Sequence, residues 1–179
     1  MPHESWTLLG SQDVSDERIF RIRHDRYRFE PTAAERDFVV LDSPDWVNVV
    51  PVTPDGRVVL IRQYRHGIRR VTLEIPGGMV DPNESPQDAA VRELEEETGY
   101  VADRVRLLGR VTPNPAIQNN RCHMFLAEGC RRLAEPKPDP FERIEVVLRP
   151  LEDIPEMVRS EEISHGLVLN AFAWVVRLV

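Results

Sequence analysis

Three glutamates in one predicted helix have the residue type and the spacing of a metal site. Glu93, Glu96 and Glu97 follow one another at positions i, i+3 and i+4, which share one face of an α-helix. Carboxylates on one face repel each other, and negative charge in the C-terminal half of a helix opposes the helix dipole. A divalent cation such as Mg²⁺ or Mn²⁺, which prefers hard oxygen ligands, would relieve both effects. A solvated acidic face is the alternative that the pattern alone leaves open.

An arginine-rich segment lies shortly before this acidic helix. Residues 57–70 contain five arginines and no acid, whereas residues 84–97 contain six acids and one base, Arg92. Arg62 and Arg65 lie near the end of a predicted strand, in the sequence IRQYR. Because a guanidinium can hold a phosphate with two hydrogen bonds, we expect Arg65 to contact a diphosphate or a terminal phosphate. A solvated arginine at a sheet edge is the alternative.

The helix that carries the glutamates is predicted by its two ends. Ser85 can cap its N-terminus, Pro86 suits its first position, and Asp88 stands three residues after the cap. Gly99 suits the left-handed position that follows a helix C-terminus. The sequence therefore predicts a helix from about residue 86 to residue 98.

Strand patterns flank this helix on both sides. From Asp45 onward, VNVVPVTPDGRVVLIRQY reads as two strands joined by a Pro-Asp-Gly turn. Further strands are predicted at 71–75, 78–80, 104–112, 120–127 and 143–149, and helices at 151–159 and 165–177. Strands combined with helices in this way indicate α+β layers.

Residues 1–44 are predicted to form about three strands of their own. Phe20 and Ile22, then Tyr27 and Phe29, alternate with charged residues at strand period. The alternation slips between Ile22 and Tyr27, which indicates a bulge or a turn there. We therefore divide the chain into a β-strand segment, 1–44, and a second region, 45–179.

The composition of the chain limits the classes of protein to which it can belong. The chain has 179 residues, of which 41% are hydrophobic and 30% charged, and this fits a folded globular protein. Its net charge of −7 argues against general nucleic-acid binding, and no run approaches the roughly 20 apolar residues of a membrane helix. No signal peptide is evident. Cys122 and Cys130 form neither a disulfide framework nor a metal-type spacing, so we expect a reducing cytoplasm.

The stretch GMVDPNESPQDAAVRELEEETGY, residues 78–100, resembles the Nudix box of the Nudix hydrolases. That box reads Gly, five residues, Glu, seven residues, Arg-Glu-aliphatic, one residue, Glu-Glu, one residue, Gly, aliphatic. Tyr100 stands where the pattern has an aliphatic residue. Seven fixed positions would match by chance on the order of 10⁻⁸ per starting point. The matching residues are Gly78, Glu84, Arg92, Glu93, Leu94, Glu96, Glu97 and Gly99.

The resemblance implies a fold, a cofactor and roles for these residues. The expected fold is the Nudix α/β/α sandwich with a mixed sheet, preceded by the small antiparallel β segment. The resemblance implies that Glu93, Glu96 and Glu97 bind Mg²⁺ or Mn²⁺, and that Glu84 pairs with Arg92 to hold the loop to the helix. The carbonyl of Gly77 is a further candidate ligand, since glycines permit a close approach.

Beyond the box, most of residues 45–170 looks like the ADP-ribose and nucleoside-diphosphate-sugar pyrophosphatase branch of that superfamily. The branch carries a proline about fifteen residues past the box, and Pro115 fits that position. It also implies that a glutamate from the loop before the last strand reaches the metals or the attacking water. Glu142 fits this catalytic role best, and a box glutamate such as Glu96 is the alternative proton acceptor.

Other residues are candidates for the substrate. Glu74 could accept hydrogen bonds from ribose hydroxyls, or form a salt bridge to a nearby arginine. Trp46 and Trp6 are possible stacking platforms for the base, although core or interface packing is the more common role of such aromatics. We expect His66 and His123 to be hydrogen-bonded structural residues.

The predicted activity is Mg²⁺-dependent hydrolysis of the diphosphate bond of a nucleoside diphosphate sugar, with ADP-ribose preferred. One rival keeps the enzyme class and changes the substrate to GDP-mannose, a dinucleotide or a mutagenic nucleotide. Another is a non-catalytic Nudix domain that senses a nucleotide sugar, which the intact glutamates disfavour. The branch further implies a homodimer in which the N-terminal strands pair with, or swap onto, a second subunit, with a monomer as the alternative.

Overall fold

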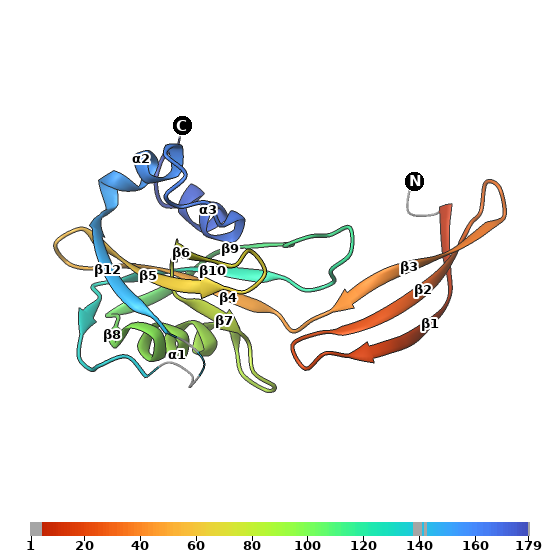
Figure 1. Cartoon of the computed structure of the whole chain (residues 1–179), viewed down its shortest axis with the longest axis horizontal. Coiled ribbons are helices and arrows are strands. Elements are labelled where there is room, and N and C mark those ends of the chain that lie inside the picture. The colour runs from red at the N-terminus through yellow and green to blue at the C-terminus, as the bar shows by residue number, and fades with distance from the viewer. Residues whose placement is uncertain (1–4, 138–140, 142, 179) are drawn as a thin grey trace. The chain divides into compact units, whose positions relative to one another are not determined.

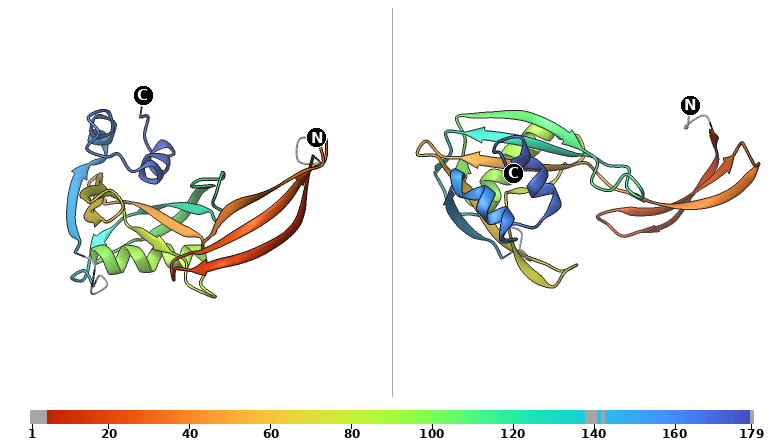
Figure 2. Two further views of the ribbon diagram at one scale, coloured as in Figure 1. Left: turned by 45° about the vertical axis from the view of Figure 1, so that its right-hand side comes forward. Right: turned by 90° about the horizontal axis from the view of Figure 1, so that it is seen from above.

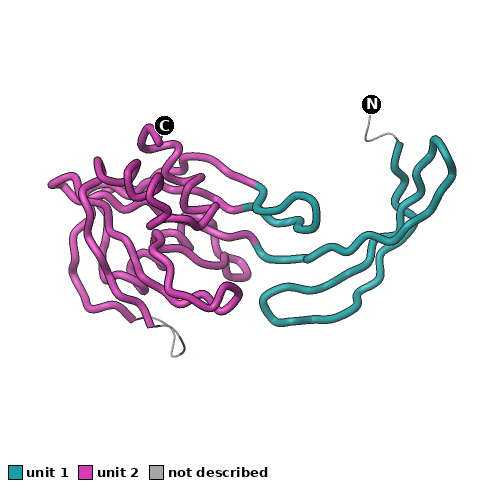
Figure 3. Tube along the Cα trace, turned by 45° about the horizontal axis from the view of Figure 1, so that its top comes forward, with its two compact units in different colours: residues 1–44, 112–121 teal, residues 45–111, 122–179 magenta. Residues whose placement is uncertain are grey.

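A computed structural model describes residues 5–137, 141 and 143–178. The chain divides into two compact units (Figure 3). The first comprises Met1–Pro44 and Thr112–Arg121, and the second comprises Asp45–Val111 and Cys122–Val179. This division differs from the sequence-based one because residues 112–121 group with the N-terminal strands. Hydrogen bonds explain the grouping: the N–H of Leu41 donates to the carbonyl of Ile117 at 2.7 Å, and the N–H of Ser43 donates to Oδ1 of Asn119 at 3.1 Å.

The second unit is built on a mixed seven-stranded sheet. Its main strands are β4 (Trp46–Val52), β5 (Arg57–Arg65), β9 (Arg104–Val111), β10 (Cys122–Glu128) and β12 (Glu145–Pro150), in the order β12-β5-β4-β10-β9. Two short strands, β6 (Arg70–Glu74) and β7 (Gly77–Met79), pair with β5 and β4. β10 runs parallel to β4, whereas β12, β6, β7 and β9 pair antiparallel with their neighbours. A separate small pair joins β8 (Tyr100–Val101) to β11 (Arg131–Arg132).

Helices cover both faces of this sheet, as Figures 1 and 2 show. Helix α1 (Pro86–Thr98) packs on one face, and α2 (Ile154–Arg159) and α3 (Gly166–Ala173) pack on the other, with the short 3-10 helix η2 (Leu151–Asp153) before α2. Along β4, Val47 and Val49 belong to the core under α1, while Val50 belongs to the core under α2 and α3. Successive strand residues face opposite sides, so apolar runs fill both cores. The predicted α/β/α sandwich is confirmed.

Helix α1 begins and ends where its capping residues predict. Oγ of Ser85 accepts a hydrogen bond from the N–H of Asp88 at 3.1 Å, and Gly99 has the left-handed φ of 71°. The segment after β11 then returns to this end of the helix. The N–H groups of Leu133 and Ala134 donate to the carbonyl of Gly99, and the N–H of Lys137 donates to the carbonyl of Glu96 at 2.7 Å. These bonds satisfy carbonyls that a helix end otherwise leaves without partners.

The other predicted elements are found with small shifts in their bounds. The strands predicted at 71–75, 78–80, 104–112 and 143–149 appear as β6, β7, β9 and β12, and β10 begins two residues later than predicted. The last helix ends at Ala173 instead of residue 177. No helix within the described residues is long and apolar enough to span a membrane.

The first unit contains a three-stranded antiparallel sheet of β1 (Trp6–Asp16), β2 (Arg21–Phe29) and β3 (Ala34–Asp42). The bulge predicted between Ile22 and Tyr27 is not in β2 itself, which pairs with β3 without any register shift, but β1 shifts register opposite this stretch, at Arg26–Tyr27 and at Ile22–Arg23. The irregularities lie in β1, between Leu8 and Gly10 and between Asp13 and Ser15. The apolar residues of β2 also change face along this stretch. Ile22 points to one side and Tyr27 to the other, with buried Asp25 paired to Arg23 between them.

The end of helix α1 provides a test of this fold. A Cβ at Gly99 would overlap the carbonyl of Ala134, and its φ of 71° is unfavourable for other residues. We expect Gly99→Ala to lower the free energy of unfolding by about 2 kcal/mol in urea denaturation. Gly67→Ala is the matched control, because nothing lies within 4 Å of its built Cβ. Equal losses in the two variants would contradict this description of the helix end.

Candidate active site

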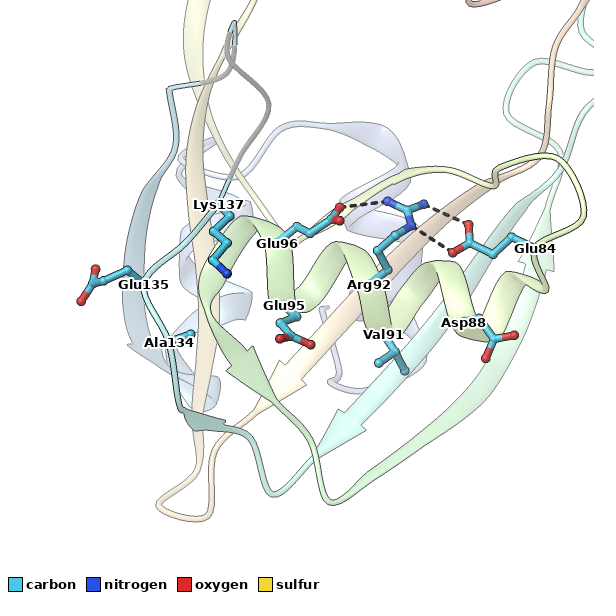
Figure 4. A pocket seen from close by; sticks show the side chains of 9 residues that line it. All are labelled: Glu84, Asp88, Val91, Arg92, Glu95, Glu96, Ala134, Glu135 and Lys137. Atoms are coloured by element: carbon cyan, nitrogen blue, oxygen red, sulfur yellow. Dashed lines mark hydrogen bonds and ion pairs between the residues drawn. The ribbon is translucent and has the colours of Figure 1, made fainter.

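Arg92 lies at the centre of the acidic face of α1 (Figure 4). Its Nε and Nη2 donate to the two carboxylate oxygens of Glu84 at 2.9 and 3.0 Å, and Nη2 also donates to the carbonyl of Met79 at 3.1 Å. Its Nη1 donates to Glu93 at 2.8 Å and to Glu96 at 3.1 Å. One guanidinium therefore binds three carboxylates, and the predicted pairing of Glu84 with Arg92 is observed.

Attraction between opposite charges explains how Arg92 and the glutamates are arranged. Hydrogen bonding to Glu84 raises the pKa of Arg92 above its usual value, although burial opposes the shift. In return, Arg92 holds the pKa of Glu84 below the usual glutamate value. Glu84 also accepts a hydrogen bond from the N–H of Asp81 at 3.1 Å. The Glu84 carboxylate thus fixes the loop before α1 to the helix, which is the structural role expected for it.

Glu97 points from α1 toward β7. It is a buried carboxylate, and its Oε2 accepts a hydrogen bond from the N–H of Gly77 at 2.9 Å. In the β4–β7 pair, the N–H of Val49 donates to Pro76, so Gly77 falls in the alternate position that makes no ladder bonds to β4. The N–H and the carbonyl of Gly77 both point away from β4 for this reason. The same register keeps that carbonyl available as a candidate ligand.

Both glycines of the GG pair are required by close approaches. A Cβ at Gly77 would overlap the carbonyl of Val47 on β4. A Cβ at Gly78 would overlap the carboxylate of Glu93 on α1. The chain passes between a strand and a helix here, and only glycine leaves room for both neighbours.

The residues fit a divalent cation, but they do not form a ready-made cage. Within the described part of the chain, no three acidic, histidine or cysteine side chains are arranged to hold a metal ion. The reason is visible in the contacts, since Glu93 and Glu96 face Arg92 and Glu97 faces Gly77. The donors are hard oxygens, and one arginine faces three carboxylates. Mg²⁺ or Mn²⁺ suits such a donor set once the side chains rotate toward it.

A second cluster surrounds Glu74, which is 2% exposed. Arg65 binds it with two hydrogen bonds, from Nε to Oε1 at 2.9 Å and from Nη2 to Oε2 at 2.6 Å. Oγ1 of Thr72 donates to Oε1 at 2.6 Å, and Nδ1 of His165 lies 3.0 Å from Oε2. Burial alone would raise the pKa of Glu74, but the hydrogen bonds from Arg65 and His165 hold it well below the usual glutamate range. The salt-bridge alternative for Glu74 is therefore the arrangement observed.

The remaining candidates lie in different settings. Arg62 forms an ion pair with Glu145 at 3.0 Å across β5 and β12. Trp46 is partly buried and packs against the core beneath α2 and α3. Glu142, the predicted catalytic glutamate, lies outside the described residues. The stacking role of Trp46 and the catalytic role of Glu142 stay predictions.

Two histidines, His123 and His165, form hydrogen bonds with acidic residues. His123 is buried, with Nε2 2.7 Å from Asp45 and Nδ1 accepting from Nε of Arg110 at 3.1 Å, so it has the structural role expected of it. His165 was not singled out by the sequence. It lies 91 residues from Glu74 along the chain. No local spacing signals that contact, because the packing of α3 alone brings the two residues together.

Comparison with known proteins agrees with this geometry. A family model described as NUDIX domain matches residues 43–169. An ADP-ribose pyrophosphatase of Bacillus subtilis is 36% identical over 144 residues, which cover 80% of this chain and 77% of that protein. ADP compounds hydrolase NudE of Escherichia coli is 26% identical over 163 residues, covering 84% of this chain and 82% of that protein. A crystal structure of an ADP compounds hydrolase has a TM-score of 0.84 at 24% identity, covers 96% of this chain and 92% of its own, and shares the fold.

The Glu84–Arg92 pair predicts a pH-dependent contribution to stability. Arg92 lowers the pKa of Glu84 in the folded state. The ion pair therefore stabilises the folded protein above the usual glutamate pKa of about 4.3, and this stabilisation is lost as the pH falls below that value. We expect Glu84→Gln to reduce the free energy of unfolding by about 1 kcal/mol at pH 7, and by less at pH 4.

Urea unfolding at the two pH values measures this difference. Glu95→Gln, at an exposed position of the same helix, is the control and should change little at either pH. A loss for Glu84→Gln that is as large at pH 4 as at pH 7 would argue against an ion pair.

Proposed function

We propose that this chain, which belongs to the NUDIX domain family, cleaves the diphosphate bond of a nucleoside diphosphate sugar. The chain is a pyrophosphatase of that family. The substrate we expect is ADP-ribose, and the products would be a nucleoside monophosphate and a sugar phosphate. The observation that carries the proposal is the group formed by Glu93, Glu96 and Glu97 beside the backbone of Gly77.

Each residue of the site has a role in this proposal. Glu93, Glu96, Glu97 and the carbonyl of Gly77 would hold Mg²⁺ or Mn²⁺. A divalent cation bound there would polarise the phosphoryl oxygens and lower the pKa of a bound water. Glu142 would accept the proton of the attacking water, with Glu96 as the alternative acceptor. Gly78, Glu84, Arg92 and Gly99 would keep the loop and the helix in position.

The cluster around Glu74 supports binding of the diphosphate through Arg65. The two bonds from Arg65 to Glu74 use Nε and Nη2 and fix the plane of the guanidinium. Its side chain remains 42% exposed, so its outer edge can reach a phosphoryl oxygen. Four donors already surround the two oxygens of Glu74, so we assign it the orientation of Arg65 instead of contact with a ribose. Arg62 and Trp46 are further candidates for contact with the substrate.

Relatives support the choice of an ADP-linked substrate. The Bacillus subtilis protein is named for ADP-ribose and the Escherichia coli protein for ADP compounds. GDP-mannose and dinucleotides remain the alternative substrates. A non-catalytic sensor is the alternative of another class, and the complete set of box glutamates disfavours it. Both cysteines are buried and unpaired, which is consistent with the reducing cytoplasm that we propose as the location.

A product assay tests the proposed function directly. Purified protein with Mg²⁺ is incubated with ADP-ribose, GDP-mannose, UDP-glucose and a dinucleotide, and the products are separated by chromatography. We expect AMP and ribose phosphate from ADP-ribose at the highest kcat/KM. Tight binding of a nucleotide sugar without any turnover would favour the sensor instead.

A pair of isosteric variants on α1 tests the metal assignment. We expect Glu97→Gln to lower kcat at least about 100-fold while circular dichroism stays unchanged, because a neutral amide is a poor ligand for Mg²⁺. Glu95→Gln is the control, since Glu95 is exposed and lies outside the proposed ligand set. Calorimetric titration with Mg²⁺ should lose affinity in the first variant only. Near-normal turnover of Glu97→Gln would remove the assignment.

The N-terminal sheet supports the proposal of a homodimer. Trp6, Tyr27, Phe29 and Phe38 gather on one face of the sheet, with ring centroids 4.7 to 6.4 Å apart. The other face carries ion pairs such as Arg28–Glu35 and Arg26–Asp37. A sheet with one apolar face is stabilised when that face is buried against another layer. We propose that a second copy of this chain provides it.

Two adjacent positions of β3 test this interface. Phe38 is 37% exposed on the aromatic face, and Val39 is 48% exposed on the opposite face. We expect a dimer by light scattering at micromolar protein, and a monomer for Phe38→Asp, because a carboxylate would be buried in the contact. Val39→Asp should stay dimeric. A monomeric wild-type protein would remove the interface, and so would loss of the dimer in both variants alike.

A further inference from the structure

Glu74 is held by an unusual number of donors for a residue outside the box. Its two carboxylate oxygens have four lone-pair directions, and four groups lie within hydrogen-bond distance: Nε and Nη2 of Arg65, Oγ1 of Thr72 and Nδ1 of His165. At 2% exposure, a carboxylate needs such partners to remain charged. The carboxylate is therefore fully satisfied in one orientation, and any lost donor leaves a buried acceptor unpaired.

His165 differs from the other donors in where it comes from. Arg65 and Thr72 belong to the β5–β6 hairpin that contains Glu74, whereas His165 precedes the first residue of α3. Among the donors to Glu74 within the described residues, His165 alone comes from outside the hairpin. Since a carboxylate only accepts, Nδ1 of His165 carries the proton. The contact at 3.0 Å therefore ties the hairpin to the helix layer.

The histidine does not serve its own helix. It occupies the N-cap position of α3 but makes no side-chain capping bond, and Ser, Thr, Asp or Asn is the usual residue there. Its side chain turns to Glu74 instead. The side chain therefore has no capping role at the start of the helix, and the interaction with Glu74 is what it contributes.

We propose that His165 is a positioning residue for Arg65, and that it acts by locking the Glu74 carboxylate in the orientation that aims the guanidinium. The inference rests on the proposed function in one respect, namely that Arg65 contacts the diphosphate. Oε2 of Glu74 accepts from both Nη2 of Arg65 and Nδ1 of His165. When the second donor is removed, the carboxylate can rotate, and the plane of the guanidinium rotates with it.

The first test observes Arg65 directly and needs no substrate. The Nε–H signal of Arg65 in ¹⁵N spectra is assigned with Arg65→Lys, and its exchange with solvent is measured. In His165→Phe, which keeps a ring and removes the donor, we expect exchange about 10-fold faster than in the wild type. His165→Asn, whose amide nitrogen replaces Nδ1, should restore slow exchange. Unchanged exchange in His165→Phe would overturn the proposal.

The second test separates positioning from a general loss of structure. With the best substrate of the panel, we expect His165→Phe to raise KM about 10-fold and to change kcat less than about twofold, and His165→Asn to rescue KM. Asn170→Ala is the matched control on α3, since Asn170 is exposed and bonds to Gly166. A fall in kcat at constant KM, or no rescue by asparagine, would overturn the proposal.

The two tests distinguish a failure of the positioning role from a failure of the proposed function. Should no panel compound be hydrolysed, the proposed function fails, while the exchange of the Arg65 Nε–H still decides whether His165 positions it. Should hydrolysis proceed with KM unchanged in His165→Phe, the positioning role fails and the proposed function stands. If His165→Phe does not fold, His165→Ala takes its place in both measurements.

Discussion

The cluster of carboxylates around Arg92 is the constraint on which the rest of the site depends. Three glutamates near the C-terminal half of one helix would repel each other and the helix dipole, and one guanidinium offsets part of that repulsion through its hydrogen bonds to Glu93 and Glu96. Because Glu84 comes from the preceding loop, the same guanidinium also ties that loop to the helix. The negative charge that remains suits a divalent cation without requiring the helix to unfold in its absence.

Close approach is the second requirement, and glycine meets it. Strand β7 passes between β4 and α1, so a side chain at Gly77 would collide with Val47 and one at Gly78 with Glu93. The absence of side chains at these two positions lets the backbone N–H of Gly77 reach the buried Glu97. The acidic helix and the strand therefore form one unit, while the Arg65–Glu74 pair is held in the neighbouring hairpin by its own donors. The acidic face of α1 suits a cation, and the exposed part of Arg65 in the hairpin suits an anionic diphosphate.

Prediction succeeded where the signal is local. The caps of α1, Ser85 and Gly99, act within one turn, and the alternation along β4 reports directly on two packed faces. It placed a bulge in β2 between Ile22 and Tyr27, whereas the extra residues lie opposite this stretch in β1. The difference lies in the pairing with β3 and β1, which are separate segments of the chain. The same limit applies to Glu74, whose sequence context left a ribose contact and a salt bridge equally open.

The sequence by itself determined the family, the acidic helix face and the pairing of Glu84 with Arg92, because all of these depend on residue types at short, fixed spacings. Only the tertiary structure decided that Glu97 faces Gly77, that the proposed metal ligands Glu93 and Glu96 face Arg92, and that His165 reaches Glu74. The Glu97–Gly77 contact joins residues 20 positions apart, and the His165–Glu74 contact joins residues 91 positions apart. Their geometry is set by how sheet and helices pack, and side-chain spacing along one element carries no record of it.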